Sequence, residues 1–309
     1  MSAFKAVNRA LAPLGIRLAR ASPAAASATA APSLEFPVAF NRERLLKLML
    51  SLEMDRPPPK ELRAYGEADC DRFIQTLGMV PQTSGRALEI GSNPYFTTIL
   101  MKQFRQFEVT MTNFFSGPVA LMSQMVSYFD AAAERRVSEK FEYWNVNVET
   151  DRLPSEDDAF DLVLFCEILE HMTNDPLAAL MEIKRVLKPG GQLIVTTPNV
   201  ARIENVARLI AGENLYDPYS GYGPYGRHNR EYTVAELERL MNHCGFEREI
   251  LFTGNVSPPV HDSLPVAVAG VGDRLSAGDL GQYIFSRWRN VAATSPGRPE
   301  WLYRSYSEA

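Results

Sequence analysis

Short apolar runs alternate with amphipathic stretches along the middle of the chain. Residues 160–166 (Phe-Asp-Leu-Val-Leu-Phe-Cys) are almost wholly apolar, as a strand covered on both faces must be. The apolar runs predict strands at residues 86–91, 107–114, 143–148, 160–166, 192–197 and 281–287. The amphipathic stretches predict helices at residues 41–53, 68–77, 176–187 and 233–244. Strands that alternate with helices predict a doubly wound α/β fold with a mainly parallel sheet.

The same pattern divides the chain into four parts. A core at residues 81–255 carries the alternating strands and helices, and a helical cap at 36–80 precedes it. Residues 1–35 are predicted to be a flexible, basic and alanine-rich tail, because Ala, Ser and Pro crowd its second half. Residues 256–309 form a C-terminal extension.

Residues 1–20 interleave basic and apolar side chains, and Lys5, Arg9, Arg17 and Arg20 supply the positive charges. One interpretation is a short basic amphipathic helix that lies on an anionic membrane surface. It predicts a cytoplasmic protein that is peripheral to the inner face of the membrane. The alternative is a frayed basic tail on a cytoplasmic protein.

Charge and cysteine content narrow the expected partners. The formal net charge of -5 provides no positive field for collecting nucleic acid, so nucleic acid is not the expected partner. The three cysteines, Cys70, Cys166 and Cys244, lie far apart, which argues against a disulfide framework and against a thiolate zinc site. No apolar run reaches the roughly 18 residues of a membrane-spanning helix. The sequence leaves the oligomeric state open.

Four motifs follow one another in a fixed order: residues 88–91 (Leu-Glu-Ile-Gly), 160–163 (Phe-Asp-Leu-Val), 167–171 (Glu-Ile-Leu-Glu-His) and 186–191 (Val-Leu-Lys-Pro-Gly-Gly). Together they resemble the class I S-adenosylmethionine-dependent methyltransferases. The resemblance implies a Rossmann-like fold, S-adenosylmethionine as cofactor and methyl transfer as the reaction. A nicotinamide-dependent dehydrogenase is the alternative on this fold, but it would show G-x-G-x-x-G after the first strand, where Gly91 is the only glycine.

The expected cofactor site lies at the carboxyl ends of the parallel strands. The residues expected to bind the cofactor are Glu89, Gly91, Ser92, Asn93, Asn113, Asn147, Val148 and Cys166. Gly91 allows the backbone to approach a ligand closely. The resemblance implies that Glu89 organises the methionine end, that Asn113 takes the ribose-binding position, and that residues 147–148 bracket the adenine.

Two departures from the family pattern concern this site. Residues 92–94 (Ser-Asn-Pro) replace further glycines, which predicts a stiffer loop. Asn113 stands where relatives place an acid, so its hydrogen bonds to the ribose lack charge assistance. These departures are the support for a non-catalytic adenosylmethionine-binding protein, an alternative that the retained Glu89 and Gly91 count against.

The candidate catalytic cluster follows the fourth strand. Glu167, Glu170 and His171 are spaced i, i+3 and i+4, so a helix beginning at Glu167 would place them on one face. With His228, from the segment before the helix capped by Thr233, they form a predicted metal site for Mg²⁺ or Mn²⁺. Glu170, His171 and His228 are the predicted catalytic residues, with a histidine as general base. The alternative is that the Glu-His pair orders the loop and His171 acts without a metal.

Residues 212–232 are rich in Tyr and Gly and are predicted to form a lid over a glycan or small-molecule acceptor. This lid resembles that of bacterial methyltransferases associated with cell-surface polysaccharide synthesis, which implies a sugar hydroxyl as acceptor. The cluster after the fourth strand, with a later histidine, also resembles metal-dependent 2′-O-methyltransferases of small-RNA ends. The motif Glu-x-x-Glu-His at residues 167–171, taken alone, also resembles quinone-pathway O-methyltransferases. A further alternative is that the tyrosines only pack the lid onto the core.

Overall fold

The computed structural model describes residues 33–37, 40–55, 58–131, 133–272, 274, 278–291, 293–295 and 297–305. The chain divides into the units Met1–Ala31 and Pro32–Ala309, and every described residue belongs to the second unit. The predicted membrane contact at residues 1–20, and nearly all of the predicted tail at 1–35, therefore lie outside the described residues. Within the described ranges, no helix has the length and apolar character needed to cross a bilayer.

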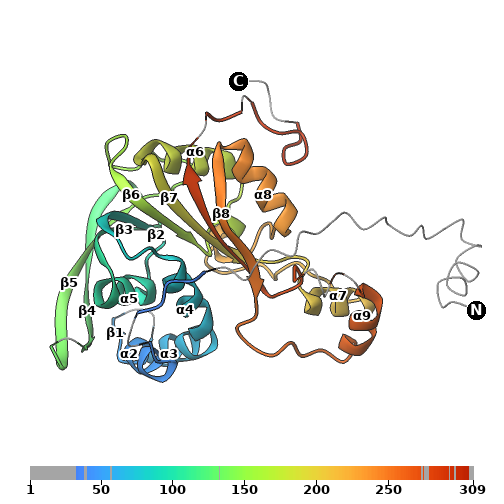
Figure 1. Ribbon diagram of the computed structural model, residues 1–309, viewed down its shortest axis with the longest axis horizontal. Coiled ribbons are helices and arrows are strands. Elements are labelled where there is room, and N and C mark those ends of the chain that lie inside the picture. Colours follow the sequence, from blue (N-terminus) through green and yellow to red (C-terminus); the bar gives the residue numbers. More distant parts are fainter. Residues whose placement is uncertain are drawn as a thin grey trace, which may run out of the picture. The chain divides into compact units, whose positions relative to one another are not determined.

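A nine-stranded sheet forms the centre of the unit Pro32–Ala309 (Figure 1). Its strands, in order across the sheet, are β1 (Glu53–Met54), β4 (Ala120–Asp130), β5 (Arg135–Asn145), β3 (Gln106–Asn113), β2 (Ser84–Ile90), β6 (Phe160–Cys166), β7 (Leu187–Pro198), β9 (Tyr283–Asn290) and β8 (Phe246–Gly254). The five strands from β5 to β7 are parallel, and β9 is antiparallel to both of its neighbours. The predicted doubly wound, mainly parallel α/β fold is confirmed.

Helices cover both faces of the sheet. They are α2 (Arg42–Leu50), α3 (Pro59–Ala68), α4 (Cys70–Met79), α5 (Phe96–Phe104), α6 (Pro176–Val186), α7 (Ile203–Ile210), α8 (Val234–His243) and α9 (Leu264–Val271), with 3₁₀ turns η2 (Leu169–His171) and η3 (Pro224–Gly226). Figure 1 shows α4 and α5 on one side of the central strands and α6 and α8 on the other.

The alternation of side chains along β6 explains its apolar sequence. Leu162 and Leu164 join the apolar cluster that includes residues of α4 and α5. Val163 and Phe165 point to the opposite face and join the cluster that includes α6 and α8. All four side chains are fully buried, so both faces of β6 require apolar residues.

Local signals set several helix ends as the sequence predicts. Thr233 caps α8, and its side chain and that of Glu236 form a reciprocal capping box. Asp175 caps α6 by accepting the Ala178 N–H. The predicted helix at 41–53 is too long: it ends at Leu50, because residues 53–54 instead pair with β4 as a short edge strand.

The long hairpin of β4 and β5 was not predicted. Only the end of β5 corresponds to the expected strand at residues 143–148. Most side chains of β4 are exposed or half-buried, so its sequence lacks the continuous apolar run that marks a central strand. Helix α3 was also not predicted, because it begins at Pro59, directly after prolines that suggest a break.

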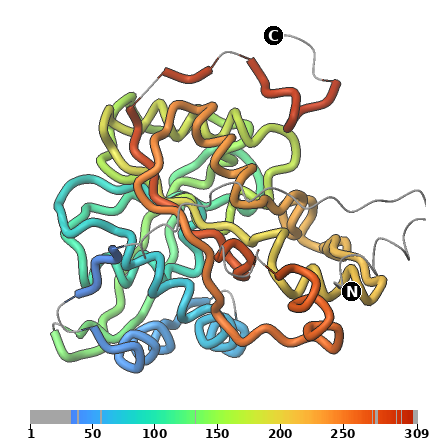
Figure 2. Tube along the Cα trace, turned by 45° about the vertical axis from the view of Figure 1, so that its right-hand side comes forward, coloured from blue at the N-terminus to red at the C-terminus, as the bar shows by residue number. Residues whose placement is uncertain are grey.

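The last strand in the sequence occupies an interior position in the sheet. β9 comes from the segment 256–309 and lies between β7 and β8. Close by, α7 and α9 lie side by side (Figures 1 and 2), joined by the buried residues Ile203, Ala207, Ala267 and Leu280. The predicted lid at residues 212–232 connects α7 to α8 and contains η3.

Candidate active site

Two adjoining cavities lie at the carboxyl ends of β2, β3, β5 and β6. They measure about 250 Å³ and about 100 Å³. Both are lined by Gly91, Asn93 and Glu167, so they form one continuous edge. Every residue that the sequence assigns to the cofactor lines at least one of them: Glu89, Gly91, Ser92, Asn93, Asn113, Asn147, Val148 and Cys166.

Gly91 forms the tight turn between the two cavities. Its φ of 73° lies in the left-handed region, which costs other residues energy. A Cβ atom at this position would lie 2.3 Å from Cδ1 of Ile168, which lines both cavities. The backbone of Gly91 therefore reaches the cavity wall, as the sequence predicts for this residue.

The side chain of Asn113 braces the turn that follows β2. Its Oδ1 accepts the Asn93 N–H at 2.8 Å and the Ser92 hydroxyl at 3.3 Å. Its Nδ2 lies 3.4 Å from the Tyr95 hydroxyl. Asn113 thus lines the larger cavity while part of its hydrogen-bonding capacity stabilises the stiff loop at residues 92–94.

A tyrosine of the lid closes the other end of the larger cavity. Asn147 Nδ2 donates to the Tyr225 hydroxyl at 2.8 Å, and that hydroxyl donates to Glu149 Oε2 at 2.9 Å. The Tyr225 ring meets Phe114 edge-on, with centroids 5.7 Å apart. Sequence reasoning assigned no role to Tyr225 or Glu149, because nothing local indicates that the lid reaches β5.

The smaller cavity is lined by a buried carboxyl group, Glu89, and a buried guanidinium group, Arg72. Burial raises the pKa of Glu89 to about 8, and the Thr98 hydroxyl donates a hydrogen bond to it. Across the cavity, the buried guanidinium of Arg72 donates to Asp69 at 3.1 Å and to the Tyr65 hydroxyl at 2.5 Å. Sequence reasoning missed Arg72, although an arginine on the apolar face of a helix was a usable signal.

Cys166 and Glu167 end β6 at the same edge. Burial raises the pKa of Cys166 to about 12, so its thiol stays protonated at neutral pH. Glu167 adopts a φ of 56° and accepts the Thr196 hydroxyl at 2.7 Å. No helix begins there, so the prediction that residues 167, 170 and 171 share one helix face is wrong; the helical turn η2 begins two residues later.

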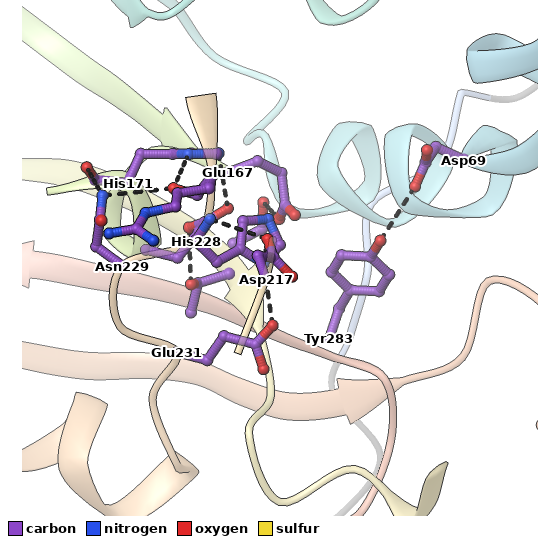
Figure 3. Close-up of polar contacts among 12 residues, drawn as sticks. Asp69, Glu167, His171, Asp217, His228, Asn229, Glu231 and Tyr283 are labelled. Carbon is purple, nitrogen blue, oxygen red and sulfur yellow. Dashed lines mark hydrogen bonds and ion pairs between the residues drawn. The ribbon is translucent and has the colours of Figure 1, made fainter. Parts of the chain in front are cut away.

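Glu170, His171 and His228 come together across the segment that follows β6. Each offers one ligand atom, and these atoms lie within 4.8 Å of one another. His171 Nε2 lies 3.8 Å from Glu170 Oε1. Glu167, the fourth predicted ligand, is outside this group and lies over the cavities instead. Figure 3 shows His171, His228 and Glu167 near one another, and the two imidazole rings meet edge to face with centroids 5.0 Å apart.

Hydrogen bonds orient both imidazoles. His171 Nδ1 lies 2.9 Å from the Arg227 carbonyl, and His228 Nδ1 lies 3.0 Å from Glu231 Oε1. Glu231 in turn forms an ion pair with Arg202. Both contacts use Nδ1, and a partner on one ring nitrogen is an arrangement that metal-binding histidines commonly show.

Within this group, burial and neighbouring charges shift the pKa of Glu170 most strongly. Its side chain is fully buried; Oε2 accepts the Thr197 hydroxyl at 2.9 Å, while Oε1 has no hydrogen-bond partner among the described residues. Burial and the nearby charge of Glu167 raise its pKa to about 8. Burial and the charge of His228 lower the pKa of His171. Burial lowers the pKa of His228, but the hydrogen bond to Glu231 and the charge of Glu170 outweigh it and raise this pKa.

The strand order and the cleft at the carboxyl edge define an α/β fold of the class I S-adenosylmethionine-dependent methyltransferase type. Residues 62–249 match the methyltransferase domain family, and the chain belongs to that family.

Individual relatives match the chain over shorter stretches. A probable S-adenosylmethionine-dependent methyltransferase of Mycolicibacterium smegmatis is 33% identical over 97 residues, which is 31% of this chain and 32% of that protein. The mitochondrial ubiquinone biosynthesis O-methyltransferase of Rattus norvegicus is 28% identical over 123 residues, which is 39% of this chain and 33% of the rat protein. The chain thus spans about a third of these curated relatives.

Solved structures resemble the fold at low identity. The S-adenosylmethionine-dependent methyltransferase from Mesorhizobium loti is 17% identical with a TM-score of 0.43, and the match covers 72% of this chain and 97% of that one. A possible histamine N-methyltransferase from Thermotoga maritima is 18% identical with a TM-score of 0.45, covering 75% and 95%.

Proposed function

We propose that this protein is an S-adenosylmethionine-dependent O-methyltransferase that acts on a hydroxyl group with the help of a divalent ion. The observation that carries this proposal is the group of Glu170, His171 and His228 beside the cofactor cavities, with ligand atoms within 4.8 Å. Methylation of an alcohol needs removal of its proton, and this group offers both a base and a set of ligands that favours divalent metals.

The two cavities fit S-adenosylmethionine. The larger one, with Asn113, Asn147 and Val148, suits the adenosine, and the smaller one suits the methionine moiety. Arg72 faces the smaller cavity as a partner for the carboxylate, and Glu89 as a partner for the ammonium. When bound, the cofactor supplies a methyl group on a positively charged sulfur.

The donor set of the metal group also fits a divalent ion. The buried Glu170 Oε1 accepts no hydrogen bond from the described residues; leaving it unsatisfied would be costly, and an ion would satisfy it. Glu170, His171 and His228 would hold that ion, because their ligand atoms lie within 4.8 Å of one another. Bound there, Mg²⁺ or Mn²⁺ would lower the pKa of an acceptor hydroxyl.

The chain's own residues account for the fate of the proton. The acceptor oxygen forms a bond to the methyl carbon as the carbon–sulfur bond breaks, and the hydroxyl proton leaves to a base. His171 suits this role in the absence of a metal, because its lowered pKa keeps the imidazole neutral near pH 7. The contact of its Nδ1 with the Arg227 carbonyl directs Nε2 towards the group.

We propose a sugar in a glycan, or in its precursor, as the acceptor. The support is the surface of the lid, where Tyr216, Tyr219 and Tyr222 are 81%, 92% and 92% exposed. Arg227 lies over the Tyr219 ring at 4.7 Å. Flat rings with polar tips and a cation suit the C–H and O–H groups of a sugar. Packing onto the core occupies Tyr225 but not these three side chains.

A second candidate acceptor is a quinone-type phenol. The resemblance of the rat relative, a ubiquinone biosynthesis O-methyltransferase, favours it. An RNA end is a third acceptor class, which the net charge of -5 disfavours. Formation of S-adenosylhomocysteine, measured with oligosaccharides, quinol precursors and short RNAs, separates these classes; no turnover with any hydroxyl acceptor would contradict the proposal.

Calorimetric titration tests the metal part of the proposal. We expect Mn²⁺ to bind the purified protein, and Glu170→Ala combined with His228→Ala to abolish binding. His243→Ala is the matched control, because His243 is the last residue of α8 and its ring contacts the Gly297 carbonyl, so the substitution should leave Mn²⁺ binding unchanged. Full activity in excess chelator would contradict the role of a metal.

A further inference from the structure

One short segment contributes to both the cofactor cavity and the metal group. We call residues 224–231 the bridge segment. Tyr225 is its contact with the larger cavity, and His228, three residues later, is its contribution to the metal group. No other part of the lid reaches both sites among the described residues.

The cavity end of the bridge segment is held through one hydroxyl group. The Tyr225 hydroxyl lies 2.8 Å from Asn147 Nδ2, 2.9 Å from Glu149 Oε2 and 3.5 Å from Thr173 Oγ1. Asn147 and Glu149 follow β5, so this hydroxyl ties the lid to the floor of the adenosine cavity. The aromatic ring of Tyr225 lies against Phe114, which directly follows β3.

The other end of the bridge segment is held by hydrogen bonds to the backbone of Glu170 and His171, two members of the metal group. The backbone N–H groups of Asn229 and Arg230 donate to the Glu170 carbonyl at 2.8 and 3.1 Å. Asn229 Nδ2 donates to the His171 carbonyl at 3.0 Å and to the Pro224 carbonyl at 2.8 Å. The last contact closes the segment on itself around η3, so Tyr225 and His228 belong to one compact loop.

We propose that Tyr225 is a positioning residue that couples the two sites: the cofactor and the divalent ion bind more tightly together than separately. This inference rests on the metal group of the proposed function. An adenosine in the larger cavity contacts Tyr225 and limits the motion of the bridge segment. His228 is then held near Glu170 and His171 before the ion arrives, so the ion loses less free energy in ordering its ligands.

The coupling is reciprocal by thermodynamic necessity. If Mn²⁺ tightens the binding of S-adenosylhomocysteine by some factor, S-adenosylhomocysteine must tighten the binding of Mn²⁺ by the same factor. Two independent measurements on the unmodified protein therefore test the coupling, without any assay of activity and without a known acceptor.

Calorimetry provides one measurement and the electron paramagnetic resonance signal of free Mn²⁺ the other. In the wild-type protein, Mn²⁺ in place of chelator should lower the Kd of S-adenosylhomocysteine by roughly fivefold or more, within the usual range of allosteric coupling. Tyr225→Phe removes only the hydroxyl and should reduce that factor to below about twofold. Tyr222→Phe is the matched control on the same lid, because Tyr222 is 92% exposed, and should retain the wild-type factor.

Each outcome has a distinct meaning. If Mn²⁺ binds and the wild-type coupling factor is one, the inference is wrong while the metal site stands. If Tyr225→Phe keeps the wild-type factor with an unchanged thermal melt, Tyr225 does not carry the coupling. If Mn²⁺ does not bind the wild-type protein, or binds equally well after Glu170→Ala, both the metal part of the proposed function and the inference are overturned.

Discussion

Two parts of the cleft are built differently. We call the part lined by Gly91 and Asn113 the donor side and the part with Glu170, His171 and His228 the acceptor side, after the roles proposed above. On the donor side, the cavity residues follow directly from the ends of neighbouring parallel strands, as Gly91 follows β2 and Asn113 ends β3. On the acceptor side, His171 follows β6, whereas His228 comes from the lid ahead of α8. The first arrangement results from the sheet itself, and the second requires a long connection to fold back onto it.

The two sides also differ in how their polar groups are satisfied. Asn113 on the donor side uses its amide to brace the neighbouring turn. Glu170 on the acceptor side keeps one oxygen buried without a hydrogen bond among the described residues. Such a group is costly for the protein alone, which is why it indicates a ligand. The amide of Asn113 is therefore satisfied by its own loop, whereas Glu170 Oε1 keeps the capacity to bind the divalent ion proposed above.

The largest expected effect on cofactor binding concerns Gly91. In Gly91→Ala, the new Cβ displaces Ile168 towards the cavities, and overpacking of this kind costs about 1–3 kcal/mol. Calorimetry should show S-adenosylhomocysteine binding weakened by roughly ten- to a hundredfold. Mn²⁺ binding by the metal group should change much less in the absence of the nucleoside.

Gly190→Ala is the matched control. Gly190 has a φ of 78°, close to the 73° of Gly91, but a Cβ there meets nothing within 4 Å. Both variants should lose about 1–2 kcal/mol of folding stability from left-handed strain. Only Gly91→Ala should lose affinity for the nucleoside. Equal affinities in the two variants would show that the turn does not border the cofactor.

The next effect concerns the pH dependence of stability through Glu89. Its pKa of about 8 in the fold exceeds the ordinary 4.5, so the folded state holds this proton more tightly than the unfolded state does. The stabilisation is complete below pH 4.5 and is lost progressively as the pH rises to about 8. Glu89→Gln should therefore gain stability relative to wild type between pH 5.5 and 8.5, on the order of 3 kcal/mol.

Urea denaturation of both proteins at the two pH values measures this difference. Asp161→Asn is a suitable comparison, because burial raises the pKa of Asp161 but the hydrogen bond from Lys188 outweighs it and lowers this pKa. The free energy of unfolding of Asp161→Asn, relative to wild type, should not increase between pH 5.5 and 8.5 as that of Glu89→Gln should. If the free energy of unfolding of Glu89→Gln differed from that of wild type by the same amount at both pH values, Glu89 would be ionised in the unliganded fold.

The smallest expected effect on the fold lies in the lid. Tyr219→Ala combined with Tyr222→Ala removes two rings that are each 92% exposed. Thermal melts should show a change below about 0.5 kcal/mol, as for other surface substitutions. Affinity for S-adenosylhomocysteine should stay unchanged, while transfer to an oligosaccharide acceptor should fall. By contrast, Tyr232→Ala removes a ring that is 1% exposed and should destabilise by about 3–5 kcal/mol.

Residues that depend on local pattern were predictable. The run of β6 and the capping box at Thr233 depend on neighbours within a few positions. Tyr225 and Glu149 were not predicted, because they meet across elements that are far apart in the sequence. Arg72 was missed although its place on the apolar face of a helix is a local signal. Glu167 was predicted as a metal ligand on one helix face with Glu170 and His171, but the helical turn begins only at Leu169 and the group of ligand atoms consists of Glu170, His171 and His228.

The sequence by itself determined the alternation of strands and helices, and with it the edge at which the cofactor residues meet. This follows because parallel strands joined by right-handed crossovers end on one side of the sheet. Only the tertiary structure decided which polar groups face one another across that edge. The contact of Tyr225 with the segment after β5 and the approach of His228 to Glu170 depend on how the lid folds back, and no local periodicity encodes that path.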